Sequence, residues 1–129
     1  MLRIELRRGG SAALAEMVAE ASRSGEYRSP WLRDPRVWHH FKDDAEILRT
    51  LQRQWSTELG GALFAAIHNG DGDLSTDVAL AYTDALARLH GVYRVLEAHA
   101  DHRAIARERE KERNLLKSAG LQFSQRAVA

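Results

Sequence analysis

The chain has 129 residues, 44% of them hydrophobic, and a formal net charge of +1, which suits one domain with a sizeable core. It contains no cysteine, which excludes disulfides, thiolate metal sites and cysteine nucleophiles. Neither a run of ~20 apolar residues nor the apolar core of a secretory signal occurs, so we expect a cytoplasmic protein without membrane contact.

The charge is unevenly distributed along the chain. Residues 37–102 carry five basic residues against ten acidic ones, whereas residues 103–129 carry seven against three. This asymmetry predicts an acidic body with a basic C-terminal arm.

The N-terminal residues 1–8 alternate apolar and charged side chains. This period of two predicts a short edge strand, with a disordered arm as the alternative. Gly9 and Gly10 are expected to end the segment. Ser11 can then cap a short amphipathic helix that ends before a connector broken by Gly25 and Pro30.

A second helix is predicted from about residue 35 to residue 67. Asp34 can cap its free N–H groups, and Pro35 suits the first helical position. Apolar residues recur every seven positions and indicate a face that packs on another helix: Phe41, Leu48, Trp55 and Ala62. Gly70 is expected to close this helix in the left-handed conformation.

A third helix is predicted without interruption over residues 76–118, capped by Ser75 or Thr76. Its apolar residues are spaced alternately by four and three: Val78, Tyr82, Ala85, Leu89, Val92 and Leu96. The short connection between the second and third helices predicts an antiparallel hairpin. Because the third helix is the longer one, we expect its last turns to overhang its partner.

Gly60 and Gly61 lie inside the second helix, where each glycine costs ~1 kcal/mol relative to alanine. In the expected register of the hairpin, Tyr82 lies opposite Gly61. Two explanations stay open, namely room for the Tyr82 ring and a kink in the helix.

These elements predict an all-α fold, in which a long antiparallel helical hairpin packs against a short N-terminal helix. The domain is expected to span residues 1–118, followed by a flexible tail over residues 119–129. Large side chains off the central seam predict a homodimer in which two hairpins complete a four-helix bundle. These side chains are Trp38, Phe64, Ile67, Leu86 and Tyr93.

The hairpin register gathers histidines and carboxylates at its open end. His40, Asp44, His99 and His102 could bind Fe, Zn or Ni through imidazole and carboxylate ligands. The sequence lacks the Glu-x-x-His and His-Glu-x-x-His motifs of di-iron bundles and zinc proteases. We therefore favour a structural interpretation, in which His99 hydrogen-bonds to Asp44, with a pH-dependent version of this contact as a further option.

No motif for nucleophilic catalysis or phosphate binding occurs, so we expect no catalytic residues. The acidic stretch NGDGDLSTD lacks the terminal glutamate of an EF-hand, since position 82 is tyrosine. Its Asn, Gly and Asp residues are those that turns require.

Basic and acidic residues alternate along residues 103–113 and can form ion pairs that stabilise an isolated helix. This interleaving argues against a phosphate-binding stripe and favours a solvated helix. The alternative is a protein contact through Ile105, Arg107, Arg109, Arg113, Leu115 and Leu116.

The leading functional hypothesis is a non-enzymatic helical interaction module that self-associates and presents its charged C-terminal helix to a protein partner. The alternative is a His/carboxylate metal-binding bundle for redox or oxygen handling. A nucleic-acid accessory protein is the third hypothesis, for which binding would weaken steeply with salt.

Overall fold

The computed structural model describes residues 2–70 and 72–121, with side chains from residue 9 onward. Four α-helices and two short 3-10 helices make up this part of the chain, and it contains no strand. They are α1 (Leu2–Ser24), η1 (Pro30–Arg33), η2 (Val37–His39), α2 (Asp44–Asn69), α3 (Leu74–Ala98) and α4 (Ala106–Ser118). The predicted all-α class is confirmed.

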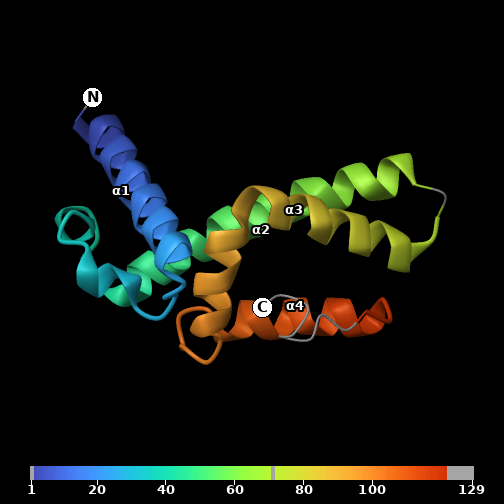
Figure 1. Ribbon diagram of the computed structural model, residues 1–129. Coiled ribbons are helices and arrows are strands. Elements are labelled where there is room, and N and C mark those ends of the chain that lie inside the picture. Colours follow the sequence, from blue (N-terminus) through green and yellow to red (C-terminus); the bar gives the residue numbers. More distant parts are fainter. Residues whose placement is uncertain (1, 71, 122–129) are drawn as a thin grey trace.

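The antiparallel pair of α2 and α3 forms the centre of the fold and confirms the predicted hairpin (Figure 1). Most apolar residues of both helices that recur at helical spacing are buried between them, whereas Ala62 and Leu89 are half-buried. The Trp55 ring lies at the middle of this core, with centroid distances of 6.1 Å to the Tyr82 ring and 4.9 Å to the Tyr93 ring. Within the described ranges, no helix has both the length and the apolar character to cross a bilayer.

Helix α1 packs across α3 at Gly91. A Cβ atom on Gly91 would lie 2.6 Å from both Val18 Cγ1 and Ser22 Oγ. Leu14 and Met17 on the same side of α1 are buried. The glycine therefore allows the two helix backbones to approach closely enough for this burial.

The predicted strand or arm over residues 1–8 is wrong, because α1 begins at Leu2 and continues through Gly9 and Gly10. Both glycines lie against the connector between α1 and α2. A Cβ on Gly9 would come within 2.8 Å of His40 Cε1, and Gly10 lies next to Phe41. Close packing thus offsets the low helix propensity of glycine.

Helix α2 begins nine residues after Pro35, at Asp44, so the predicted start is wrong. Its N-cap is Asp43, whose carboxylate accepts a hydrogen bond from the Glu46 N–H at 2.9 Å. The segment around Pro35 forms 3-10 turns instead, which bury Trp31 and Val37. At the other end of α2, Gly70 is extended, and Gly72 adopts the positive φ of 94°.

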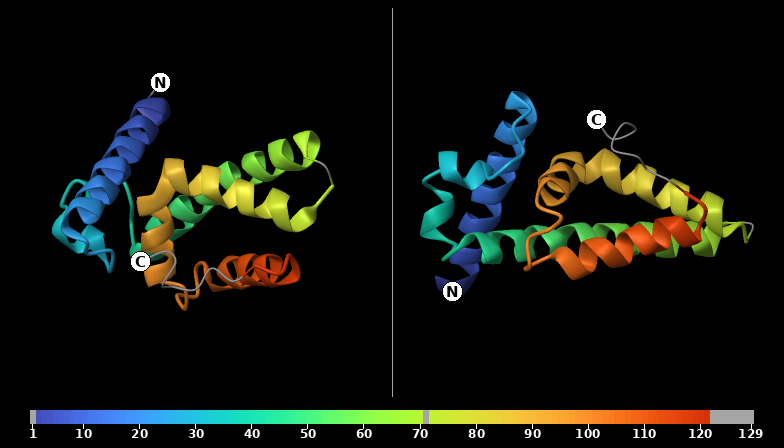
Figure 2. Two further views of the ribbon diagram at one scale, coloured as in Figure 1. Left: turned by 45° about the vertical axis from the view of Figure 1, so that its right-hand side comes forward. Right: turned by 90° about the horizontal axis from the view of Figure 1, so that it is seen from below.

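The single helix predicted over residues 76–118 is also wrong. Asp73 caps α3, which deviates from helical geometry at Leu89 and ends at Ala98. After residues 99–105 the chain reverses, and α4 runs back alongside the hairpin in both views of Figure 2. The expected overhang does not exist, because the reversal buries Ile105 and Leu116 in the core.

The structure also bears on the expected role of the two glycines in α2 and on the expected C-terminal tail. A Cβ on Gly60 or Gly61 would have no neighbour within 4 Å, so the explanation through the Tyr82 ring is wrong, and α2 continues as one helix through both positions. In the predicted tail, Ala119 is buried and Leu121 is half-buried, whereas residues 122–129 lie outside the described part.

Candidate functional site

The predicted histidine cluster is divided between two sets of contacts. His102 Nε2 lies 3.5 Å from Asp44 Oδ2. His99 Nε2 instead accepts a hydrogen bond from the Ser29 N–H at 3.0 Å, and its Nδ1 lies 2.6 Å from the Val95 carbonyl oxygen. The predicted hydrogen bond between His99 and Asp44 is therefore wrong, since His102 occupies that place.

His40 lies against α1, with its Nδ1 buried and without a hydrogen-bond partner. Among the side chains described, from residues 9–70 and 72–121, no three of His, Asp or Glu gather into a group that could hold a metal ion. Of the four predicted ligands, the structure brings His102 and Asp44 into contact. The metal site stays a prediction.

His99 should make stability depend on pH. Burial lowers the pKa of this imidazole below its ordinary value of 6.5, although the hydrogen bond to Val95 acts in the opposite direction. The unfolded chain then takes up a proton first as the pH falls, so stability is full above pH 6.5 and decreases below it. We expect urea denaturation to show this decrease between about pH 7 and pH 5.

The substitution His99→Gln keeps an oxygen that can accept from the Ser29 N–H but removes the titration. It should flatten the pH dependence, whereas the control His39→Gln, on an exposed side chain, should leave it unchanged. Equal pH profiles for His99→Gln and the natural chain would contradict this assignment.

The six predicted partner-binding residues of the C-terminal arm do not form one surface. Ile105, Arg109 and Leu116 are buried inside the protein. Arg107 and Arg113 are exposed, and Leu115 is half-buried. Helix α4 is therefore held by one face and presents the other to solvent.

A buried charged pair holds α4 against the hairpin. The guanidinium of Arg109, which is 1% exposed, donates to Glu112 Oε2 at 2.6 Å and to Gln52 Oε1 of α2 at 3.4 Å. The Trp55 indole N–H donates to Glu112 Oε1 at 2.6 Å. Glu97 of α3 lies 3.4 Å from Arg109, so the pair connects three helices.

The environment of this pair shifts several pKa values. Burial disfavours the charge on Arg109, yet the neighbouring Glu112 and Glu97 keep its pKa above the ordinary value. Burial raises the pKa of the Tyr82 and Tyr93 hydroxyls, and nearby carboxylates add to the effect. The raised pKa keeps Arg109 charged beside Glu112.

The sequence did carry a signal for this arrangement. Residues 105, 109, 112 and 116 are spaced by four, three and four, which places them on one helical face. Two of them are the apolar residues Ile105 and Leu116. Alternating charges mask this pattern, because every face of such a helix contains ionisable residues.

Helix α2 has an outward stripe that no other part of the described chain covers. Its residues are spaced by one, three or four, lie on the face opposite the hairpin core, and are all exposed. They are Arg49, Arg53, Ser56, Thr57, Gly60, Phe64, Ile67 and His68. The Phe64 side chain is 73% exposed and that of Ile67 is 55% exposed.

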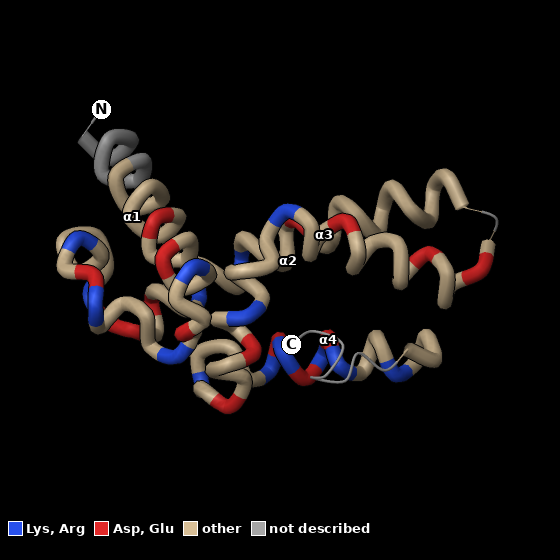
Figure 3. The backbone as a smooth tube through the Cα atoms, in the orientation of Figure 1, with Lys and Arg blue, Asp and Glu red and all other residues tan. Residues whose placement is uncertain are grey.

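The outward stripe of α2 changes character along its length. Arg49 and Arg53 make one end basic, small residues occupy the middle, and Phe64 stacks on His68 at the other end with ring centroids 5.9 Å apart. The stripe contains no acidic residue, and residues 59–69 contain no Lys, Arg, Asp or Glu, so the end of α2 nearest the turn to α3 is tan in Figure 3.

A groove of about 580 Å³ lies between α1, α2 and the deviation in α3 at Leu89. Its apolar lining includes Leu14, Val18 and Val92, and polar residues such as Ser22 and His90 stand at its sides. Its volume falls within the range of small-molecule sites. Its charged and polar groups do not converge on one position, so we assign it no ligand.

Comparison with known proteins adds no relative. The chain matches no protein-family model, no curated protein and no solved structure. The residues described above therefore carry the functional argument by themselves.

Proposed function

We propose that the protein is a self-associating helical interaction module, in which two copies pair through the outward stripe of α2. The observation that carries this proposal is the exposure of Phe64 and Ile67 on a helix face without acidic residues. Contiguous exposed apolar side chains are typical of protein contact surfaces. Antiparallel pairing of α2 with its symmetry mate covers them in both copies at once.

Charge complementarity favours a second copy as the occupant. An antiparallel contact centred on Gly60 brings Arg49 of one copy to the turn after α2 of the other, where Asp73 lies. That turn also follows the C-terminal end of α2, where the helix dipole attracts cations. The two-fold axis repeats this attraction between Arg49 and the turn after α2, so it acts at both ends of the contact.

The small residues at the centre of the stripe suit the same arrangement. A Cβ atom on Gly60 would lie within 4 Å of no atom in the described part of the chain. Its helix cost of about 1 kcal/mol relative to alanine therefore has no compensation inside one copy. A second helix that crosses at Gly60 would offset this cost, since glycine lets two helix backbones approach closely.

The substitution Phe64→Glu should abolish the dimer. Burial of one phenylalanine contributes about 1.5–3 kcal/mol, and the two-fold axis applies the loss twice, so we expect dimerisation to weaken by at least about 100-fold. Sedimentation equilibrium at micromolar concentrations measures this change. The matched control is Leu32→Glu, because Leu32 is also 73% exposed but lies on η1.

A monomeric natural chain at these concentrations would refute the proposal, as would equal effects of Phe64→Glu and Leu32→Glu. The orientation can be tested separately, because the chain contains no cysteine. A disulfide requires Cα atoms about 4.4–6.8 Å apart. Under mild oxidation, Gly60→Cys should therefore form a covalent dimer, whereas Leu32→Cys should stay monomeric on a non-reducing gel.

A further inference from the structure

The outer surface of α4 is basic, although its sequence alternates in charge. Arg109 and Glu112 turn inward and neutralise each other. Four cations and two acids of α4 remain exposed: Arg107, Lys111, Arg113 and Lys117, with Glu108 and Glu110. On the surface of the folded helix, cations therefore outnumber acids by two to one, which is not evident from the alternating sequence.

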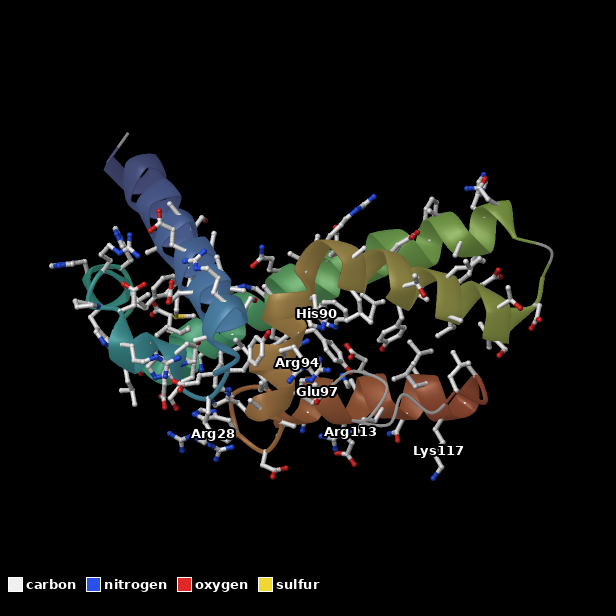
Figure 4. The ribbon with its side chains drawn as sticks, viewed as in Figure 1. Arg28, His90, Arg94, Glu97, Arg113 and Lys117 are labelled. Carbon is white, nitrogen blue, oxygen red and sulfur yellow. The ribbon has the colours of Figure 1, made fainter. Side chains whose placement is uncertain are left out.

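The reversal between α3 and α4 brings a further cation to this surface. Arg28, from the loop after α1, donates to the Ala98 carbonyl oxygen at 3.0 Å. Figure 4 shows Arg28, Arg113 and Lys117 projecting to the same side of the molecule. A pocket of about 480 Å³ lies between Arg28 and Arg113.

We propose that the outer surface of α4 and the neighbouring Arg28, together called the basic face, bind the phosphate backbone of duplex nucleic acid. The exposed cations of α4 form two pairs, Arg107 with Lys111 and Arg113 with Lys117, about 120° apart around the helix axis. Cations at positions i and i+4 of a helix are about 6 Å apart along its axis. A nucleic-acid strand carries one phosphate per about 3.4 Å of duplex axis, so the two cations of one pair can meet alternate phosphates of a strand. Exposed Asn114 and Ser118 add hydrogen-bond donors of the kind that contact phosphate oxygens.

An acidic protein fits this face less well. Protein interfaces depend on buried apolar or aromatic anchors. The exposed large hydrophobic residues of the described chain lie on α2, α3 and the connector, and none lies on α4. Phosphate contacts, by contrast, supply affinity through charge alone. Among residues 9–70 and 72–121, no exposed aromatic ring lies on α4 for single-stranded bases to stack on, which favours a duplex.

The acidic residues near the basic face do not cancel its excess of positive charge. Glu97 borders the pocket, but its carboxylate is engaged by Arg109 and by the Tyr93 hydroxyl at 3.0 Å. Asp101, Glu108 and Glu110 are exposed and reduce the potential locally. The hairpin end of the molecule has a net negative charge, because residues 54–87 contain five acidic residues and no Lys or Arg. A duplex would therefore meet the α4 side first.

The test is fluorescence anisotropy of a labelled duplex DNA of about 20 base pairs with the full chain. Four phosphate contacts, one for each exposed cation of α4, predict that affinity falls by about 100-fold between 50 and 200 mM salt. The double substitution Arg113→Glu and Lys117→Glu should weaken binding at 50 mM salt by at least about 10-fold. Both residues are exposed, and circular dichroism would verify that the variant is folded.

The matched control is Arg33→Glu with Lys42→Glu, which changes the net charge by the same amount on exposed residues of the connector. This control should retain binding. Equal losses in both variants would show attraction by net charge alone and overturn the proposal. Failure of the natural chain to bind at 50 mM salt would overturn it too. Displacement of the duplex by poly-glutamate at equal charge concentration would assign the face to acidic proteins instead.

The inference is independent of the dimer. The Phe64→Glu variant keeps the whole basic face and should bind the duplex with the same salt dependence per copy. Loss of self-association with retained DNA binding would therefore separate the two proposals.

Discussion

Replacing Arg109 by alanine is expected to lower the free energy of unfolding by about 3–5 kcal/mol. The substitution leaves the buried Glu112 carboxylate without its cationic partner, while the Trp55 indole N–H still donates to it. A buried charge without a partner destabilises a protein by several kcal/mol, whereas an intact buried ion pair adds little to the free energy of unfolding. Urea denaturation followed by circular dichroism measures the loss, and Arg107→Ala on the exposed side of α4 should leave stability unchanged.

Removal of the whole pair should be much milder. In the double variant Arg109→Met with Glu112→Gln, both charges of the pair are removed, and the glutamine oxygen can still accept from the Trp55 indole N–H. Most of the stability lost in Arg109→Ala should return. An Arg109→Ala variant as stable as the natural chain would show that this pair does not hold α4 against the hairpin.

The substitution Gly91→Leu is expected to destabilise the protein by about 1–3 kcal/mol. Even a Cβ atom at this position would lie 2.6 Å from Val18 Cγ1, and a valine side chain cannot move away at low cost. The added side chain must therefore push α1 away from α3. This outweighs the gain in helix propensity of about 1 kcal/mol that loss of a glycine brings.

Denaturation of Gly91→Leu beside Ala87→Leu tests this directly. Ala87 is exposed one turn earlier on the same helix, so the same side chain meets no packed neighbour there. We expect Ala87→Leu to be neutral. A Gly91→Leu variant as stable as Ala87→Leu would mean that α1 and α3 do not pack at this point.

The hairpin could be predicted from the sequence because its signal is strong and repeated. The spacing of apolar residues around Trp55 and from Val78 to Leu96 leaves one helical face for each partner, and the turn between them is rich in Gly and Asp. The end of α3 could not be predicted in the same way. Residues 99–105 contain no Gly or Pro, and the bend there depends on contacts with distant residues, such as the hydrogen bond from Ser29 to His99.

The candidate surfaces were predictable to different extents. Phe64 and Ile67 stand off the hairpin seam in the sequence itself, and the structure leaves both exposed. The basic face depends on which charges α4 buries. An alternating run of Arg and Glu does not specify this, because several faces of the helix offer similar ion pairs. The burial of Ile105 and Leu116 in the core decides which face of α4 points inward and therefore which of its charges are buried.

The return of α4 also affects the order in which the chain folds. The residues that join α4 to the core, Trp55 and Glu112, are 57 positions apart, whereas α2 and α3 meet across a turn of a few residues. Local contacts form faster than distant ones because they close shorter loops. The hairpin can therefore assemble before α4 docks, and contacts made after the folding barrier act mainly on the unfolding rate. The buried pair of Arg109 and Glu112 would then set how long the folded state persists rather than how quickly it is reached.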